Sequence, residues 1–435
     1  MRILVVGSGG REHAICWALR RTSKEPLQLF CAPGNAGIAQ IAECISISAD
    51  DLPGLGAFAQ KAAIDFTMVG PEVPLALGIV DEFESRGLRI VGPTRAAARL
   101  ESSKSFAKDF MLRHSIPTAR YATAHSVAEA EQMLKSDLFG NDRTPVVIKA
   151  DGLAAGKGVF VAQDRRAALD ALRQFESGAL ADGAAERIVI EEMLNGREVS
   201  LLLFSDGHNY KLMPPARDHK RIGEGDTGPN TGGMGAVTDD GLIEQGTVDQ
   251  IVIEIVEPTL QACRDEGFPF KGILFIGLML TANGPRVLEY NVRFGDPETQ
   301  AILVRLKSDL AAIFQAIIAG RLSEVGVEWS GDSSACVVLA AKGYPAKSEV
   351  GTPINGLDLA ATRNDVAVFH AATSRNKRGE WSTAGGRVLG VTAKGSTLEV
   401  ALARSYDAIA GIHWDGMQYR RDIGRSEATG AVGAG

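Results

Sequence analysis

The chain has 435 residues, of which 45% are hydrophobic and 23% charged, and its net charge is −7. One hydrophobic core seldom supports a chain of this length, so we expect about two to four domains. The mild acidity argues against a nucleic-acid partner, which usually meets a basic surface, and no apolar run is long enough to span a membrane. The five cysteines lack metal-binding spacing, which favours core positions in a cytoplasmic protein.

Strand and helix patterns alternate over residues 1–101. The first apolar stretch is too short for a signal peptide and is predicted to be the first strand. Such alternation predicts an N-terminal α/β domain with an open parallel sheet and crossover helices. The predicted strands cover residues 2–6, 27–31, 66–69 and 89–91, and the predicted helices cover residues 13–21 and 54–63.

A glycine-rich turn follows the first predicted strand and opens the first helix. Backbone N–H groups at such a turn face a bound anion, so Gly9 and Gly10 are candidate contacts of a substrate phosphate. The dinucleotide-binding pattern GxGxxG would need a third glycine where this chain has Glu12. A nicotinamide or flavin cofactor is therefore disfavoured, whereas a smaller phosphorylated ligand and a tight turn without a ligand both stay open.

Two further loops follow strands of the same predicted sheet. One covers residues 32–37 and contains Asn35, and the other covers residues 69–75 and contains Gly70 and Glu72. Open α/β sheets bind ligands at the carboxyl ends of their strands. We therefore predict that the three loops hold one phosphorylated small molecule, with Glu72 contacting its hydroxyls or an amine.

A smaller unit at residues 121–190 follows a helix predicted at residues 102–114. Its expected elements are a helix at residues 127–134 and strands at residues 146–150, 158–161 and 188–190.

A glycine-rich loop joins the first and second of these strand segments. Gly156 and Gly158 would let the backbone approach the phosphates of ATP closely, and Lys149 and Lys157 would add positive charge. The P-loop pattern GxxxxGK[ST] is not met, because Gly158 follows Lys157. A hairpin with a cationic tip is the alternative.

The connector that follows residue 190 carries Glu191 and Glu198. An adenine would lie against such a connector, with Glu198 on the ribose hydroxyls, although acidic turns are common. A long block with an antiparallel pattern then runs to about residue 327. Short strands and a closing helix at residues 398–409 predict a C-terminal β-rich unit at residues 328–424, and residues 425–435 are predicted to be disordered.

The segment at residues 287–294 alternates apolar and polar residues strictly, which predicts a strand. Glu289, Asn291 and Arg293 share its polar face, and Leu288, Tyr290, Val292 and Phe294 share the other. Carboxylate and amide oxygens are ligands that Mg²⁺ takes when it also holds phosphates, and a guanidinium binds carboxylate or phosphate. A solvated polar face is the alternative interpretation.

Taken together, these motifs resemble the ATP-grasp ligases and, more narrowly, the phosphoribosylamine–glycine ligases. The similar segments lie in the same order over residues 1–424 and include Ser103-Lys104, Asp218-His219-Lys220-Arg221, the glycine-rich residues 228–236 and residues 419–424. Two departures are Arg197, where a second acid is usual in the connector, and residues 370–373, which lack a usual glycine.

This resemblance implies an N-terminal domain at residues 1–101, an ATP-grasp region at residues 102–327 with a lid at about residues 121–190, and a C-terminal domain at residues 328–424. It implies ligation of glycine to 5-phosphoribosylamine through glycyl phosphate, with ATP as co-substrate and Mg²⁺ or Mn²⁺ as metal. The implied site comprises catalytic Arg293 and Asp218, ATP-binding Lys104, Lys149, Gly156, Lys157, Gly158, Glu191 and Glu198, substrate-binding Gly9, Gly10, Asn35, Gly70, Glu72, Asp218 and Arg293, and metal-binding Glu289 and Asn291.

The seven histidines form no triad or metal pattern, so His13 and His219 are expected to be structural or to contact substrate. We expect a monomer or weak homodimer with one activity and small-molecule partners only. The rivals are an ATP-grasp ligase for another carboxylate, a nicotinamide-dependent oxidoreductase and an inactive nucleotide-binding scaffold. A scaffold would have no use for Lys149, Glu289, Asn291 and Arg293 together.

Overall fold

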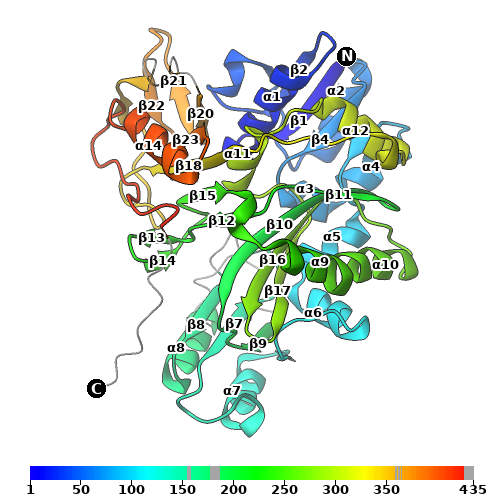
Figure 1. Ribbon diagram of the computed structural model, residues 1–435, viewed down its shortest axis with the longest axis vertical. Helices are drawn as coiled ribbons and strands as arrows, with labels where there is room; N and C mark the ends of the chain where they lie inside the picture. The colour runs from blue at the N-terminus through cyan, green and yellow to red at the C-terminus, as the bar shows by residue number, and fades with distance from the viewer. Residues whose placement is uncertain (154–157, 177–186, 358–359, 361–362, 364, 426–435) are drawn as a thin grey trace.

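The computed structural model describes residues 1–153, 158–176, 187–357, 360, 363 and 365–425. An N-terminal α/β domain and a C-terminal β-rich part lie side by side, a central sheet runs below them, and a small lid forms the far end (Figure 1). The multidomain fold class predicted from the sequence is confirmed. Within the described residues, no helix combines the length and the apolar character that crossing a membrane requires.

The N-terminal domain is built on a five-stranded sheet with the order β3-β2-β1-β4-β5, in which every pair is parallel. The central strand β1 is apolar and buried, as expected for a parallel sheet covered on both faces. The elements of the N-terminal domain are β1 Arg2–Gly7, α1 Gly10–Thr22, β2 Gln28–Pro33, η1 Ile38–Gln40, β3 Glu43–Cys44, α2 Leu52–Lys61, β4 Phe66–Val69, α3 Glu72–Leu77, α4 Ile79–Ser85, β5 Ile90–Val91 and α5 Arg95–Ser102.

The lid has its own antiparallel sheet with the order β6-β9-β7-β8. Its buried residues, among them Ile148, Leu172 and Ile190, form a hydrophobic cluster separate from the main core, so the lid can move as a unit. The lid follows α6 Lys104–Arg113 and contains β6 Tyr121–Ala124, α7 Val127–Lys135, η2 Asp137–Phe139, β7 Val146–Ala150, β8 Val159–Ala162, α8 Arg165–Glu176 and β9 Ile188–Glu192.

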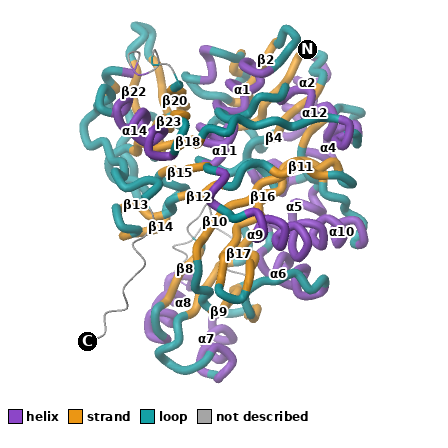
Figure 2. Tube along the Cα trace, viewed as in Figure 1, coloured by secondary structure: helices purple, strands orange, loops and turns teal. Residues whose placement is uncertain are grey.

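The central sheet is antiparallel, and at one end of it β10 pairs with β16 and β16 pairs with the edge strand β17. Helices α9 and α10 lie beside β16 and β17 (Figure 2). The elements of this part are β10 Arg197–Asp206, β11 Tyr210–Leu212, β12 Ala216–Asp218, β13 Arg221–Gly223, β14 Thr227–Asn230, β15 Gly235–Thr238, η3 Asp240–Leu242, α9 Gln245–Ile251, the π-helical η4 Val252–Val256, α10 Glu257–Asp265, β16 Lys271–Thr281, β17 Gly284–Asn291, α11 Glu298–Leu303, α12 Leu310–Ala319 and η5 Leu322–Glu324.

Three C-terminal strands continue the central sheet, because β18 pairs antiparallel with β15 and β23 lies between β18 and β20, whereas β19, β22 and β21 form a separate three-stranded sheet. The path runs β17-β16-β10-β12-β15-β18-β23-β20, and β11 pairs with β10. A backbone ladder therefore joins the metal-binding strand predicted from the sequence to the C-terminal part. This part contains β18 Ser333–Ala340, β19 Pro353–Ile354, β20 Val366–His370, β21 Thr373–Arg375, β22 Trp381–Thr383, β23 Arg387–Gly395 and α14 Leu398–Ile409.

The strand predicted at residues 287–294 ends earlier, at Asn291, and its strict alternation is wrong at Leu288. A register shift pairs Gly277 with Glu289 and Leu278 with Val287, so Leu288 is the extra residue of a bulge. Beyond the bulge, Tyr290 is buried and Asn291 half-buried, as predicted. The helix predicted at residues 102–114 starts at residue 104, because the hydroxyl of Ser103 caps it by accepting from the N–H of Phe106.

Candidate active site

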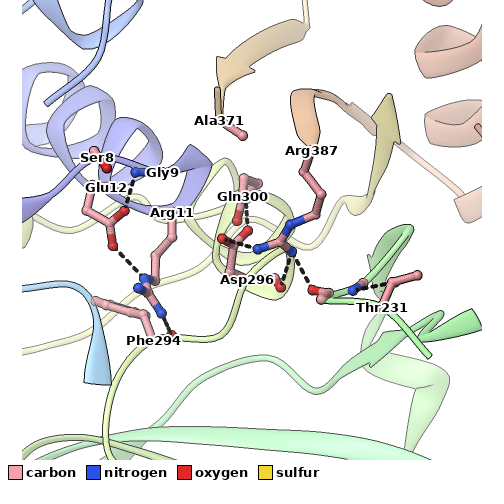
Figure 3. Close-up of polar contacts among 12 residues, drawn as sticks. Ser8, Gly9, Arg11, Glu12, Thr231, Phe294, Asp296, Gln300, Ala371 and Arg387 are labelled. Carbon is pink, nitrogen blue, oxygen red and sulfur yellow. Dashed lines mark hydrogen bonds and ion pairs between the residues drawn. The ribbon is translucent and has the colours of Figure 1, made fainter. Parts of the chain in front are cut away.

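The glycine turn after β1 is occupied by the side chain of Glu12. The Glu12 carboxylate accepts from the N–H of Gly9 at 2.6 Å and from Nε of Arg11 at 2.6 Å (Figure 3). A Cβ atom on Gly70 would lie 2.0 Å from Oε1 of Glu12. Gly70 is thus needed to make room for Glu12, which fills the place of the third glycine in a dinucleotide site. The sequence argument against such a cofactor agrees with this geometry.

Gly10 lies where three parts of the chain meet. A Cβ atom here would be 2.9 Å from Nε2 of Gln300 and 3.5 Å from Cβ of Ala371. The same Gln300 donates to Asp296 at 2.7 Å, and Arg387 pairs with Asp296 at 2.8 Å (Figure 3). The turn predicted to contact a phosphate therefore lies against the C-terminal part and the segment after β17.

Asn35 uses its side chain within the folded chain. Its Nδ2 donates to the carbonyls of Ser8 at 2.7 Å and His370 at 2.9 Å, and its Oδ1 accepts from the N–H groups of Gly37 and Ile38. The side chain therefore ties two loops of the N-terminal domain to the C-terminal part. The substrate contact predicted for Asn35 stays a prediction.

Arg293, just after the end of β17, forms ion pairs with the N-terminal domain. Its Nε lies 3.3 Å from Oε2 of Glu72, its Nη2 lies 2.9 Å from Oε1 of Glu101, and the same Nη2 donates to Oδ1 of Asn291 at 3.2 Å. Burial works to raise the pKa of Glu72, but Arg293 and Arg11 outweigh it and hold that pKa below its ordinary value. The structure thus places three predicted residues together and adds Glu101, which sequence reasoning missed.

Two lysines flank the carboxylate of Glu191. Lys149 lies 2.8 Å from Oε1 and Lys108 lies 2.9 Å from Oε2, and all three residues are buried. Burial lowers the pKa of Lys108 to about 8, against the opposing effect of Glu191. Glu191 therefore holds Lys149 in place. Lys108 was also missed, since nothing in its local sequence distinguishes it from a surface lysine.

Lys104 lies at the start of α6, and its Nζ donates to the carbonyl of Gly152 at 2.8 Å. Gly158 is described and buried directly before β8, whereas Gly156, Lys157 and the tail after residue 425 lie outside the described residues. The roles predicted for Gly156, Lys157 and the disordered tail stay predictions.

Glu289 lies in a cluster of acids around Lys220. Lys220 forms an ion pair with Glu198 and lies 3.8 Å from Glu289. Burial works to raise the pKa of Glu289, but Lys220, Lys149 and Lys104 outweigh it and hold the pKa below its ordinary value. Glu289 is therefore ionised, and Glu198, predicted to meet a ribose, is paired with Lys220 in this state.

In the same cluster, the pKa of Asp218 is shifted in the opposite direction, above its ordinary value. Burial, followed by the negative charges of Glu298, Glu198 and Glu289, raises the pKa of Asp218 to about 8 although Lys220 opposes the shift. A carboxyl group that titrates near neutral pH can exchange a proton with an amine during catalysis. Its place beside Glu289 fits the catalytic role expected from the resemblance.

The donor set fits a divalent ion that is shared with phosphates. Glu289 supplies an anionic oxygen and Asn291 an amide oxygen, and Mg²⁺ commonly binds through one or two protein oxygens plus substrate phosphates. Within the described part of the chain, no three His, Cys, Asp or Glu side chains are grouped to hold a metal ion by themselves. A self-contained metal cage is thus not what these residues build.

Both histidines inside the motifs have structural partners. Nδ1 of His13 accepts from the N–H of His370 at 2.8 Å, and Nε2 of His219 accepts from the N–H of Gly424 at 3.0 Å. Burial, with a smaller effect of His370, lowers the pKa of His13 to about 3. This agrees with the expectation that neither histidine acts as a base.

Nζ of Lys149 in the lid sheet donates to the carbonyl of Leu288 on β17 at 3.2 Å, so the lid faces the acid-bearing strand of the central sheet, and the chain is of the ATP-grasp class. Three family models match: "Phosphoribosylglycinamide synthetase, ATP-grasp (A) domain" at residues 102–299, the N domain at residues 1–101 and the C domain at residues 334–426. The biotin carboxylase of Campylobacter jejuni has a similar fold, with a TM-score of 0.72, 16% identity and coverage of 96% of this chain and 92% of that chain.

Relatives that match over their full length show which ATP-grasp family the chain belongs to. A phosphoribosylamine–glycine ligase of Xanthomonas axonopodis is 48% identical over 98% of this chain and 97% of its own length. One of Caldanaerobacter subterraneus is 44% identical over 97% of this chain and 99% of its own length. The crystal structure of the Thermotoga maritima enzyme has a TM-score of 0.83 and 33% identity, covering 97% of this chain and all of that one. The chain belongs to the phosphoribosylamine–glycine ligase family.

Proposed function

We propose that this chain joins glycine to 5-phosphoribosylamine, using ATP, to give glycinamide ribonucleotide, ADP and phosphate. The observation that carries the proposal is the position of Arg293, which pairs with Glu72 of the N-terminal domain and hydrogen-bonds Asn291 beside the predicted metal ligand Glu289. One guanidinium therefore links the side that would bind the phosphorylated amine to the side that would bind ATP.

The first step transfers the γ-phosphoryl group of ATP to the carboxylate of glycine. This step needs charge neutralisation and in-line positioning, since a carboxylate is a poor electrophile until it becomes an acyl phosphate. Lys104 and Lys149 would neutralise phosphate charge from the lid side, and Arg293 would hold the glycine carboxylate. Mg²⁺ or Mn²⁺ on Glu289 and Asn291 would supply further charge neutralisation when bound.

The second step is attack of the phosphoribosylamine nitrogen on the carbonyl carbon of glycyl phosphate. The C–N bond forms, the C–O bond to phosphate breaks, and the nitrogen loses one proton. Asp218 in its ionised form is the candidate acceptor of that proton, because burial raises its pKa to about 8 and makes its carboxylate a stronger base than an ordinary one. Arg293 would stabilise the oxyanion of the tetrahedral intermediate.

The remaining assignments belong to the same proposal. Gly9 and Gly10 would contact 5-phosphoribosylamine, since they border the junction at Gln300 and Asp296, and Glu72 would contact it from its position beside Arg293. Gly158 and the glycine loop before it would cover ATP. The division at residues 1–101, 102–327 and 328–424 and a monomeric or weakly dimeric state also remain proposals. Small molecules are the proposed partners.

A substrate-omission assay tests the reaction. Phosphate release from ATP should require glycine and 5-phosphoribosylamine together, and addition of hydroxylamine to enzyme, ATP and glycine should trap glycine hydroxamate from the acyl phosphate. Replacement of glycine by alanine, aspartate or bicarbonate should abolish turnover. Turnover with one of those carboxylates and none with glycine would assign the chain to a different ATP-grasp reaction.

A further inference from the structure

Residues 419–424, here called the C-terminal strap, have no part in the ligation steps above. The strap lies against the hairpin formed by β13 and β14, far away in sequence but adjacent in space (Figure 1). It also reaches His219, which directly precedes Lys220. The strap therefore contacts the chain on both sides of a residue in the acid cluster.

Arg420 is the centre of this contact and is 1% exposed. Its Nη1 donates to the carbonyl of Arg221 at 3.1 Å and to Oδ1 of Asp226 at 2.5 Å. Its Nε and Nη2 donate to the two carboxylate oxygens of Asp422, each at 2.8 Å. A planar guanidinium makes all four contacts at once, which an ammonium group cannot do.

Three further hydrogen bonds join the strap to the same segment. Oδ2 of Asp422 accepts from the N–H of Gly225 at 2.8 Å, and the N–H of Arg421 donates to Oε1 of Glu224 at 3.1 Å. The N–H of Gly424 donates to Nε2 of His219 at 3.0 Å. The hairpin tip and the residue before Lys220 are thus both held by the strap.

The hairpin has little of its own to hold its position. It is a separate two-stranded sheet, and Glu224, Gly225, Thr227, Gly228 and Pro229 are exposed. A two-stranded hairpin without a hydrophobic face is at best marginally stable alone. Its position therefore depends on its contacts with the strap.

Lys220 connects this arrangement to the candidate active site. Its carbonyl accepts from the N–H and the hydroxyl of Thr231, at 2.7 and 2.8 Å. Its ammonium pairs with Glu198 and lies 3.8 Å from Glu289. Arg420 holds the carbonyl of Arg221, the residue after Lys220, so the strap fixes the backbone beside the residue whose ammonium reaches the two acids.

We propose that the C-terminal strap is a clamp that positions Lys220 between Glu198 and Glu289, with Arg420 as its positioning residue. The strap itself touches neither acid. Its effect on catalysis passes through the hairpin to Lys220, and through Lys220 to the acids proposed to bind ATP and its metal. This inference rests on the proposed function for the identity of that nucleotide site.

Arg420→Gln tests the clamp, and Arg421→Gln is the matched control. Arg421 is exposed, its side chain lies over the ring of Tyr419, and its backbone N–H bond would persist in the variant. We expect Arg420→Gln to weaken binding of a fluorescent ATP analogue with Mg²⁺ about tenfold, the order of effect of losing a charged hydrogen bond. The KM for glycine should stay unchanged, and Arg421→Gln should match the wild type.

A double-mutant cycle with Lys220→Met separates positioning from general loss of structure. If Arg420 acts through Lys220, the double variant should bind the ATP analogue no more weakly than Lys220→Met alone. Additive effects, or equal loss of affinity for all substrates, would overturn the clamp. If Arg420→Gln does not fold, Asp226→Asn, which weakens the same contact from the hairpin side, takes its place in the cycle.

These outcomes are distinct from failure of the proposed function. The ATP analogue reports the clamp even if the wild type shows no turnover with glycine and 5-phosphoribosylamine. Absence of that turnover would refute the substrate assignment and leave the binding cycle as the test of the strap.

Discussion

Nη2 of Arg293 lies 2.9 Å from Oε1 of Glu101, although Glu101 belongs to α5 and Arg293 follows β17. The other oxygen of Glu101 accepts from the backbone N–H of Val292 at 2.8 Å. One buried carboxylate thus fixes both the backbone before Arg293 and the guanidinium itself. Burial raises the pKa of Glu101, against the opposing charge of Arg293.

Glu101→Gln should reduce kcat/KM for glycine by about tenfold to a hundredfold, the range expected when a charged hydrogen bond of about 1.5–3 kcal/mol is lost. The amide can still accept from Val292, so the fold should persist. Steady-state kinetics with glycine as the varied substrate would measure the effect. Glu82→Gln, which breaks a surface ion pair with Arg86, should leave the kinetics unchanged; equal kinetics for both variants would contradict the role of Glu101.

Lys108→Met should weaken ATP binding about tenfold. Glu191 would then have Lys149 as its remaining cation, so the charge of Lys149 would be neutralised and attract phosphates less. Isothermal titration with an unreactive ATP analogue would report the change. Lys135→Met, at an exposed helix position paired with Glu131, is the control. Unchanged ATP affinity in Lys108→Met would show that Lys149 does not depend on this charge sharing.

Three buried histidines should make the protein less stable in acid. Burial lowers the pKa of His13 to about 3, and burial lowers the pKa values of His219 and His370 to about 4, with smaller effects of neighbouring cations. Below the ordinary pKa of 6.5, the unfolded chain binds protons that the folded chain does not, so unfolding is favoured as the pH falls from about 6.5 to about 4.

Each such histidine adds up to about 1.4 kcal/mol per pH unit to the loss of stability in this window. Urea unfolding at pH 7, 6 and 5 would measure the slope. His13→Gln keeps an acceptor for the N–H of His370 and should make the slope shallower by about one proton. A slope equal to that of the wild type would mean that His13 is not buried in its neutral form.

Gly70→Ala should destabilise the fold by about 1–3 kcal/mol, the usual cost of inserting a methyl group into a filled space. The added Cβ would lie 2.0 Å from Oε1 of Glu12. Thermal unfolding would measure the loss. Gly246→Ala is the control, because no atom lies within 4 Å of its Cβ position. An unaffected melting temperature in Gly70→Ala would show that Glu12 can move aside freely.

Local patterns in the sequence were enough to predict several elements at their observed bounds. The strands Phe66–Val69 and Val146–Ala150 and the helix Leu398–Ile409 agree with the structure because their periodicity and flanking turns are unambiguous. The bulge at Leu288 was missed, since a bulge depends on the partner strand β16 and leaves no mark on the alternation. The pairing of β15 with β18 was also missed, because it joins segments that are far apart in the sequence.

Some residues of the candidate site could likewise be predicted from the sequence, and others could not. Glu289, Asn291 and Arg293 were found because three polar residues on one face of a predicted strand are costly unless they bind something. Asp218 and Lys104 came from the resemblance. Glu101 and Lys108 were missed because their ion pairs join distant segments. Asn35 shows the converse, because a loop asparagine that looks available for a ligand uses its side chain to join two domains.

The most direct test of the account is formation of glycinamide ribonucleotide from ATP, glycine and freshly generated 5-phosphoribosylamine by the wild type, Arg293→Ala and Arg286→Ala. Arg286 lies on β17, the strand that Arg293 follows, and its Nη1 donates to the carbonyl of the adjacent Pro285. We predict product with the wild type and Arg286→Ala, and a loss of about a hundredfold or more in kcat/KM for Arg293→Ala. Undiminished product formation by Arg293→Ala would contradict the central role given to this guanidinium.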